Sequence, residues 1–169
     1  SWSCALSPAL AGGASVSYTL SAIQSDGSST SGASTVTFTI DTTAPAITIS
    51  SPTVVSVING SSNLTAYAVS GACENGLAIT VSVTSGATTV NPGTQPTCSS
   101  GSYSTTVNIS SLADGTLTFT AAQTDAAGSA GTTSVAVTKD VSPPQISSFS
   151  VNDGDATTGS VLVTVKASL

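Results

Sequence analysis

The sequence predicts an all-β protein made of tandem antiparallel β-sandwich domains, and its composition and its patterning both support this. Thr, Val and Ile are frequent, whereas strong helix formers such as Glu, Lys and Gln are scarce, a bias that favours pleated strands over helices. Short stretches of alternating apolar and polar residues are separated by clusters of Gly, Pro, Ser, Asn and Asp. Such evenly spaced short strands are typical of an antiparallel sandwich.

An internal repeat predicts how the chain is divided. The run DAAGSAGTTSVAVTKDVSPP from Asp125 has a diverged copy, DGSSTSGASTVTFTIDTTAP, from Asp26. The offset is the same at each landmark: 125 − 26, 140 − 41 and 144 − 45 are all 99. A fixed period is the signature of a repeat array. We therefore expect residues 1–43 to be the C-terminal part of a preceding unit, 44–141 a complete unit, and 142–169 the N-terminal part of a following one.

Period-2 alternation places the strands within this division. In the complete unit we expect strands near residues 46–50, 64–70, 78–84, 103–109, 115–124 and 132–139, with a short edge piece at 54–58. In the preceding unit we expect strands at 18–23 and 36–40. The residues expected to point inward are mostly small: Ile47, Ile49, Leu64, Ala66, Ile79, Val81, Val83, Val107, Ile109, Leu117, Phe119, Ala121, Val135 and Val137.

The charge and the residue inventory exclude several classes of function. The chain has two Lys and Arg against eight Asp and Glu, a net charge of −6, so no basic cluster could neutralise nucleic-acid phosphates. No uninterrupted apolar stretch is long enough to insert this segment into a membrane. Histidine is absent, so Ser-His and Cys-His nucleophilic pairs cannot form. The sequence therefore predicts that this is not an enzyme.

Cys73 and Cys98 fall within the complete unit and are expected to form a disulfide. Such a bridge would contribute roughly 3–4 kcal/mol in the chain-entropy model, a large share of the stability of a domain with a thin core. A metal site is the alternative, although the sequence has no histidine and no CxxC motif. The disulfide indicates an oxidising, extracellular compartment.

Two stretches resemble a known family of repeats. The run LADGTLTFTAAQTDAAGSAGTTSVAVTKDVSPP from Leu112 resembles the signature of bacterial Ig-like (BIg-type) repeats, and VSGACENGLAITV from Val69 resembles their cysteine-bearing subgroup. These repeats recur in tandem in large secreted adhesins and cell-surface stalk proteins. One departure is Ser129, where the family often has Asn.

The resemblance implies immunoglobulin-like sandwiches that act as a structural stalk or spacer extending a terminal functional domain on the bacterial cell surface. Neighbouring repeats of the same chain are the expected partners, together with other subunits if edge strands pair in a fibre. The alternative function is an accessory module that binds glycan or protein, for which Tyr67 and Tyr103 are the aromatic candidates.

No cofactor is required, but calcium is a candidate at the joints between units. Asp41 and Asp140 occupy equivalent linker positions, Asp26 and Asp125 equivalent turns, and Asp153 and Asp155 lie early in the following unit. Calcium takes six to eight oxygen ligands, which we expect to gather best at the Asp140 joint, with Asp125 taking part. The alternative is that each Asp only caps its own turn.

Overall fold

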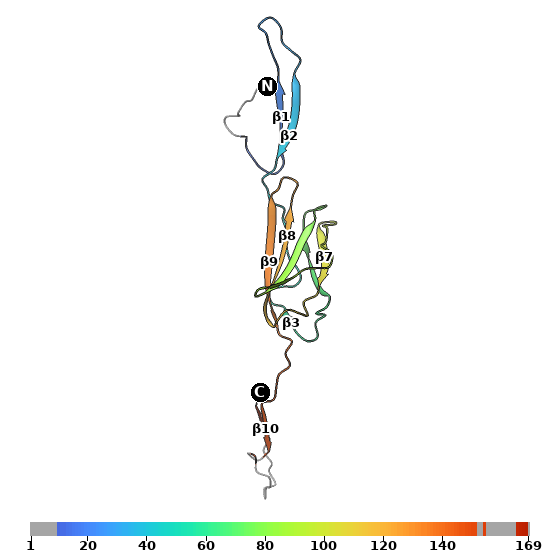
Figure 1. The fold of residues 1–169 in the computed structure, drawn as a ribbon, viewed down its shortest axis with the longest axis vertical. Coiled ribbons are helices and arrows are strands. Elements are labelled where there is room, and N and C mark those ends of the chain that lie inside the picture. Colours follow the sequence, from blue (N-terminus) through green and yellow to red (C-terminus); the bar gives the residue numbers. More distant parts are fainter. Residues whose placement is uncertain (1–9, 152–153, 155–164, 169) are drawn as a thin grey trace.

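The computed structural model describes residues 10–151, 154 and 165–168, and it has an elongated shape with three parts in a row (Figure 1). A leading hairpin, β1 (Val16–Ala22) with β2 (Ser34–Ile40), stands at one end. A trailing hairpin, β10 (Ser148–Val151) with β11 (Val165–Ser168), stands at the other. The central part, residues 45–141, is a β-sandwich. The described residues contain no α-helix, and so none that could cross a membrane.

The larger sheet of the central sandwich has five strands in the order β3-β9-β8-β5-β6. Its strands are β3 (Val57–Ile58), β9 (Ala130–Lys139), β8 (Gly115–Thr124), β5 (Ile79–Ser85) and β6 (Thr88–Val90). The pairings are antiparallel except that β3 runs parallel to the end of β9. The order β9-β8-β5-β6 matches the G-F-C-C′ order of variable-type immunoglobulin sheets. The predicted all-β, immunoglobulin-like class is therefore confirmed.

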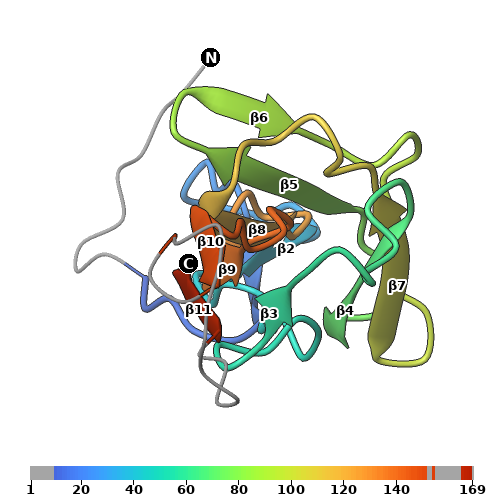
Figure 2. The ribbon, with the colours of Figure 1, turned by 90° about the horizontal axis from the view of Figure 1, so that it is seen from below.

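The smaller sheet pairs β4 (Tyr67–Ala72) with β7 (Ser102–Val107) and lies beside the larger one (Figure 2). The chain entering from the leading hairpin extends this sheet along the other edge of β4. Thr48 N–H donates to Ala72 O at 3.0 Å and Ser50 N–H to Ser70 O at 2.8 Å. The approach is so close that a Cβ on Gly71 would lie 1.9 Å from Thr48 O, so only glycine fits there.

Four of the predicted strands are absent or shorter in the structure, and β6, β10 and β11 were not predicted. Residues 46–50 form no regular strand: besides their hydrogen bonds to Ala72 and Ser70, the segment makes one isolated bridge, Ser51↔Ser70, and prolines at 45 and 52 bound it on both sides. The strand predicted at 64–70 begins only at Tyr67, because the Asn63 side chain accepts from Ala66 N–H at 3.1 Å and makes a turn. The strand predicted at 103–109 ends at Val107, after which Asn108 accepts from Ser110 N–H. The edge piece expected at 54–58 is reduced to β3.

The core of the sandwich contains most of the predicted residues. Ile79, Val81, Val83, Leu117, Phe119 and Ala121 are fully buried, as their alternation along β5 and β8 requires. Ile49, Leu64 and Val135 are only partly buried. Five core residues were not predicted to point inward: Ile58, Val69, Cys98, Tyr103 and Leu112. Val69 is out of phase with the alternation assumed for its strand, and Leu112 lies in the loop before β8.

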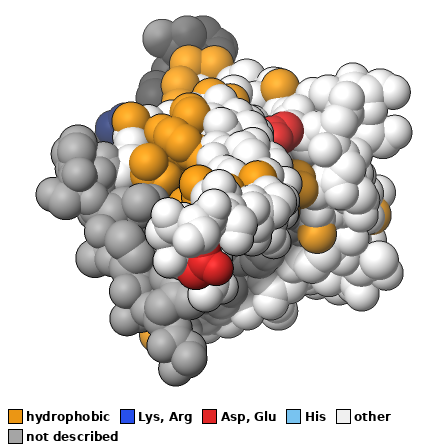
Figure 3. Space-filling view, turned by 90° about the horizontal axis from the view of Figure 1, so that it is seen from above, with side chains coloured by type: hydrophobic (Ala, Val, Ile, Leu, Met, Phe, Trp, Pro, Cys, Tyr) orange, Lys and Arg blue, Asp and Glu red, His pale blue; other side chains and the backbone are white. Residues whose placement is uncertain are grey.

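The leading hairpin repeats the register of the β8–β9 hairpin. Tyr18 pairs with Phe38 in the first, and Leu117 pairs with Val137 in the second, each 99 residues further along (117 − 18, 137 − 38). Their environments differ, however: Leu20 is 41% exposed, whereas Phe119 at the equivalent position is fully buried. The view onto the leading end shows hydrophobic side chains gathered at the surface (Figure 3).

Candidate functional site

The entry joint, where the leading hairpin meets the sandwich, brings three carboxylates to one hollow. Asp41 in the linker, Asp125 in the β8–β9 turn and Glu74 after β4 line a hollow of about 370 Å³. Asp125 belongs to this joint and not to the Asp140 joint, because the ten residues of β9 separate its turn from Asp140. The expectation that Asp125 acts with Asp140 is therefore wrong. Glu74 was not predicted, since its proximity depends on the tertiary fold.

The aspartates of the turns and linkers accept backbone hydrogen bonds from their own segments. Asp125 Oδ1 accepts from Ala127 N–H at 2.8 Å and Ser129 N–H at 2.9 Å. Asp41 Oδ1 accepts from Thr43 N–H at 3.0 Å. Asp26 Oδ1 accepts from Ser29 and Ser28 N–H, and these bonds lower the pKa of its carboxyl. The contacts are those of turn caps.

The carboxylates of the entry joint fit a calcium ion only in part. Their chemistry is suitable, because calcium prefers carboxylate and carbonyl oxygens. Their spacing is not, since among the residues that the structure describes no three His, Cys, Asp or Glu side chains come close enough to hold a metal ion. Asp153 and Asp155, the other predicted ligands, lie outside the described residues.

The exit joint is held by Asp114, in the loop before β8. Its Oδ2 accepts from Ser142 Oγ at 2.8 Å and from Val141 N–H at 3.3 Å, while Asp140 Oδ1 accepts from Ser142 N–H at 3.3 Å. The Ser142 bond is the main cause that lowers the pKa of the Asp114 carboxyl. Asp114 thus ties the exit linker to the body of the sandwich.

Lys139, the last residue of β9, also contacts Asp114 at this joint, and its side chain is buried. Its side chain is only 3% exposed; Nζ donates to Leu112 O and lies 3.8 Å from Asp114 Oδ1. Because a buried ammonium is costly without partners, this lysine depends on both contacts. The equivalent position 99 residues earlier is Ile40, so the lysine contact has no counterpart at the entry joint.

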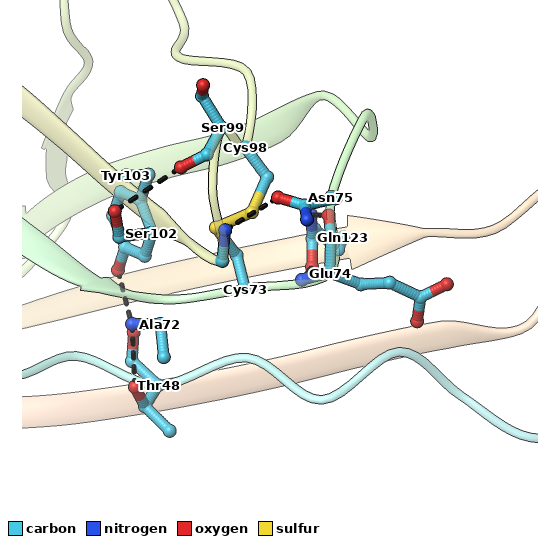
Figure 4. The surroundings of a disulfide bond; sticks show 11 residues. Thr48, Ala72, Cys73, Glu74, Asn75, Cys98, Ser99, Ser102, Tyr103 and Gln123 are labelled. Atoms are coloured by element: carbon cyan, nitrogen blue, oxygen red, sulfur yellow. Dashed lines mark hydrogen bonds between the residues drawn. A yellow bond between two sulfur atoms is a disulfide. The ribbon is translucent and has the colours of Figure 1, made fainter.

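Cys73 and Cys98 form a disulfide in the structure, with their Cα atoms 5.9 Å apart (Figure 4). It joins the segment after β4 to the segment before β7. Hydrogen bonds from Cys73 N–H to Gly101 O and from Cys98 N–H to Leu77 O support it on both sides. In addition, Asn75 Oδ1 accepts from Gly101 N–H at 2.6 Å.

Gln123 on β8 fastens the disulfide loop to the larger sheet (Figure 4). Its side chain, 1% exposed, donates through Nε2 to Glu74 O at 2.9 Å and accepts through Oε1 from Glu74 N–H at 3.0 Å. Gln95 makes the same pair of bonds with the backbone of Val81. Neither glutamine was predicted, because only the fold shows which backbone segment lies within reach.

Replacing Gln123 by Leu is expected to lower the free energy of unfolding by about 1–3 kcal/mol, because the Glu74 N–H and C=O lose their hydrogen bonds to a buried amide. Urea denaturation followed by circular dichroism measures the change. Gln95→Leu is the matched comparison and is expected to cost less, since Gln95 is exposed and water can replace its bonds. Equal losses for the two variants would contradict the role given to burial.

The two tyrosines considered for glycan binding are packing residues. Tyr103 is 4% exposed and its hydroxyl donates to Thr48 O at 2.9 Å. Burial raises the pKa of the Tyr103 phenol to about 12. Tyr67 is half-buried, with its ring centroid 5.7 Å from that of Phe119. A buried ring cannot stack on a sugar, so Tyr103 is excluded as a binding platform.

The buried Tyr103 phenol predicts a loss of stability at alkaline pH. The pKa is near 10 in the unfolded chain and about 12 in the folded one, so the unfolded state loses its proton first. The stability that the protonated Tyr103 phenol contributes is fully present below about pH 10 and is lost as the pH rises from about 10 towards 12. Thermal melts across this range should show a decline that is smaller in Tyr103→Phe. The same decline in that variant would assign the effect to another group.

Comparison with known proteins identifies similar solved structures. No family model matches the chain, and no curated protein matches it. It is similar to a solved structure described as a tetra-tandem repeat in the extending region of a large adhesion protein, with a TM-score of 0.52 and 28% identity over 82% of this chain.

A second similar structure is described as a Ca²⁺-stabilized adhesin that helps an Antarctic bacterium reach out and bind ice. Its TM-score is 0.42, with 25% identity over 80% of this chain. The present chain spans about a third of the length of each of these structures (34%). The likeness in fold to adhesin repeat domains rests on the first of these structures.

Proposed function

We propose that this chain is a segment of a structural stalk, in which immunoglobulin-like repeats follow one another end to end and hold a terminal domain away from the cell. The observation that carries the proposal is the recurrence of one hairpin, in one register, 99 residues apart. Entry and exit lie at opposite ends of the sandwich (Figure 1), an arrangement that lengthens a rod with each added unit. Similarity to the extending region of an adhesion protein supports the same role.

The test is to measure length against the number of repeats. Chains that carry one, two or three copies of residues 44–141 between the present end segments should increase their maximum dimension in equal steps in small-angle X-ray scattering. Copies that fold back side by side would thicken the particle without lengthening it. That result would overturn the stalk proposal.

In this proposal the units have the boundaries 1–43, 44–141 and 142–169 and belong to the BIg-type repeats of bacterial surface or secreted proteins. The outward apolar side chains of the leading hairpin, such as Leu20 and Phe38, correspond to core positions of the central sandwich. They are covered by the rest of their own unit in a longer chain. Pairing with other subunits in a fibre is the alternative way to cover them.

We further propose that calcium stiffens the entry joint, where Asp41, Asp125 and Glu74 line one hollow. In the structure these oxygens are too far apart to share one ion, so the proposal requires the joint to close when calcium binds. The melting temperature should then rise by a few degrees in millimolar calcium over chelator, and Asp125→Asn should abolish the rise. Asp26→Asn removes an equivalent turn cap away from the hollow and should leave the rise unchanged. Identical melting with calcium and with chelator would leave only the capping role.

The alternative function, an accessory module that binds glycan or protein, has Tyr67 as its remaining aromatic candidate. Binding of the chain to a glycan array, lost in Tyr67→Ala but kept in Tyr103→Phe, would favour it. No specific contact supports this alternative over the stalk.

A further inference from the structure

The described residues include two Asn-Gly pairs, Asn59-Gly60 and Asn75-Gly76, a dipeptide that can undergo an intramolecular cyclisation. The backbone nitrogen of a residue that follows Asn can attack the side-chain amide carbon and close a five-membered ring. Glycine favours this step because it lacks a Cβ and reaches backbone conformations that other residues avoid. The two pairs are both exposed, so their hydrogen bonds decide which can react.

Asn75-Gly76 is held by contacts that reach across the fold. Asn75 Oδ1 accepts from Gly101 N–H at 2.6 Å, and Gly76 N–H, the nitrogen that would attack, donates to Cys98 O at 3.0 Å. Both partners belong to the segment that the Cys73–Cys98 disulfide ties to this loop. The attacking nitrogen and the amide are therefore fixed until this loop opens.

Asn59-Gly60 is held only by bonds within its own turn. Asn59 Oδ1 accepts from Ser61 N–H at 3.0 Å, Asn59 N–H donates to Ser62 Oγ at 3.2 Å, and Asn59 O accepts from Ser62 N–H at 3.0 Å. A surface turn of this kind opens with little free energy, whereas a cross-linked loop opens rarely. The turn also keeps the Asn59 amide close to the backbone that follows it.

We propose that Asn59-Gly60 is a site of spontaneous covalent modification, at which the protein converts its own asparagine to aspartate and isoaspartate. Gly60 N, on losing its proton, forms a bond to Asn59 Cγ, and the bond from Cγ to the amide nitrogen breaks, releasing ammonia. Water then opens the ring at either carbonyl. The net reaction consumes one water, releases one ammonia and leaves one new carboxylate.

This site lies against the exit joint, so its conversion changes that joint. Ile58 O, directly before Asn59, accepts from Asp140 N–H at 2.8 Å, and a Cβ on Gly60 would lie 4.0 Å from Val141 O. The new carboxylate adds a negative charge beside a linker that already carries Asp140. In isoaspartate the main chain runs through the former side-chain carbon atoms and is longer by one atom. This change in the backbone displaces the neighbouring hydrogen bond between Ile58 and Asp140. We infer that the joint loosens as the protein ages.

The experiment follows both asparagines in the intact, oxidised chain. The protein is incubated in mildly alkaline buffer made with ¹⁸O-water, and peptide mapping by mass spectrometry measures the amide-to-acid mass change at each site. Isoaspartate is detected by an enzyme that methylates its carboxylate. Asn59 should convert more than about tenfold faster than Asn75, a ratio equal to 1.4 kcal/mol of difference in opening.

Variants make the assignment specific. Gly60→Ala, which has room for its Cβ, should slow conversion at Asn59, while Gly93→Ala, a glycine not preceded by Asn, should not. Reducing the disulfide should accelerate Asn75 and leave Asn59 unchanged. In the aged protein, hydrogen exchange should speed up at Asp140 N–H but not at Gly76 N–H. An intact Asn59, or equal rates at the two sites in the oxidised chain, would overturn the proposal.

Discussion

Replacing both Cys73 and Cys98 by serine is expected to lower the free energy of unfolding by about 3–4 kcal/mol. The bridge closes a loop in the unfolded chain and so lowers the entropy of the unfolded state. In the folded protein it aligns the segments around Glu74 and Gly101, which hydrogen-bond to each other. For a small sandwich this is a large fraction of the total stability. Urea denaturation, followed by circular dichroism, measures the difference.

A reductant provides the control for this prediction. Dithiothreitol should weaken the wild-type protein to the level of the double variant and should have no further effect on that variant. A wild-type protein whose denaturation midpoint does not move on complete reduction would show that the bridge contributes no stability.

Replacing Phe119 by Ala is expected to cost about 3–5 kcal/mol, the usual result of emptying a buried aromatic site. Phe119 is fully buried between the two sheets and packs against Tyr67. The matched control is Leu20→Ala, at the position 99 residues earlier and 41% exposed, where a cost within about 1 kcal/mol is expected. Both are measured by the same denaturation probe.

The comparison of these two variants also tests the repeat proposal. In a longer chain that supplies the rest of the leading unit, Leu20→Ala should become costly, because its side chain would then be buried. A large cost for Leu20→Ala in the present chain would mean that the leading hairpin already packs against something in solution.

Several features of the fold could be predicted from local patterns. Alternation along 115–124 and 132–139 predicts β8 and β9 and their inward side chains, because successive residues of a strand face opposite sides. The 99-residue offset predicts equivalent hairpins, and the structure has Tyr18↔Phe38 and Leu117↔Val137 in one register. The strand predicted at 46–50 is not a regular strand in the structure, because the segment pairs only in part with β4, and alternation does not show how far two segments pair.

By itself, the sequence determined the fold class, the repeat period and the candidate cysteine pair, all of which depend on local spacing and residue type. Only the tertiary structure decided which distant groups meet. It placed Asp125 with Asp41 and Glu74, buried Lys139 beside Asp114, and brought Gln123 to the backbone of Glu74, 49 residues away. Such contacts depend on how the strands stack and cross. A side chain reaches only a few ångströms, so its partner is set by which segment the fold places beside it, and no pattern along the chain shows this.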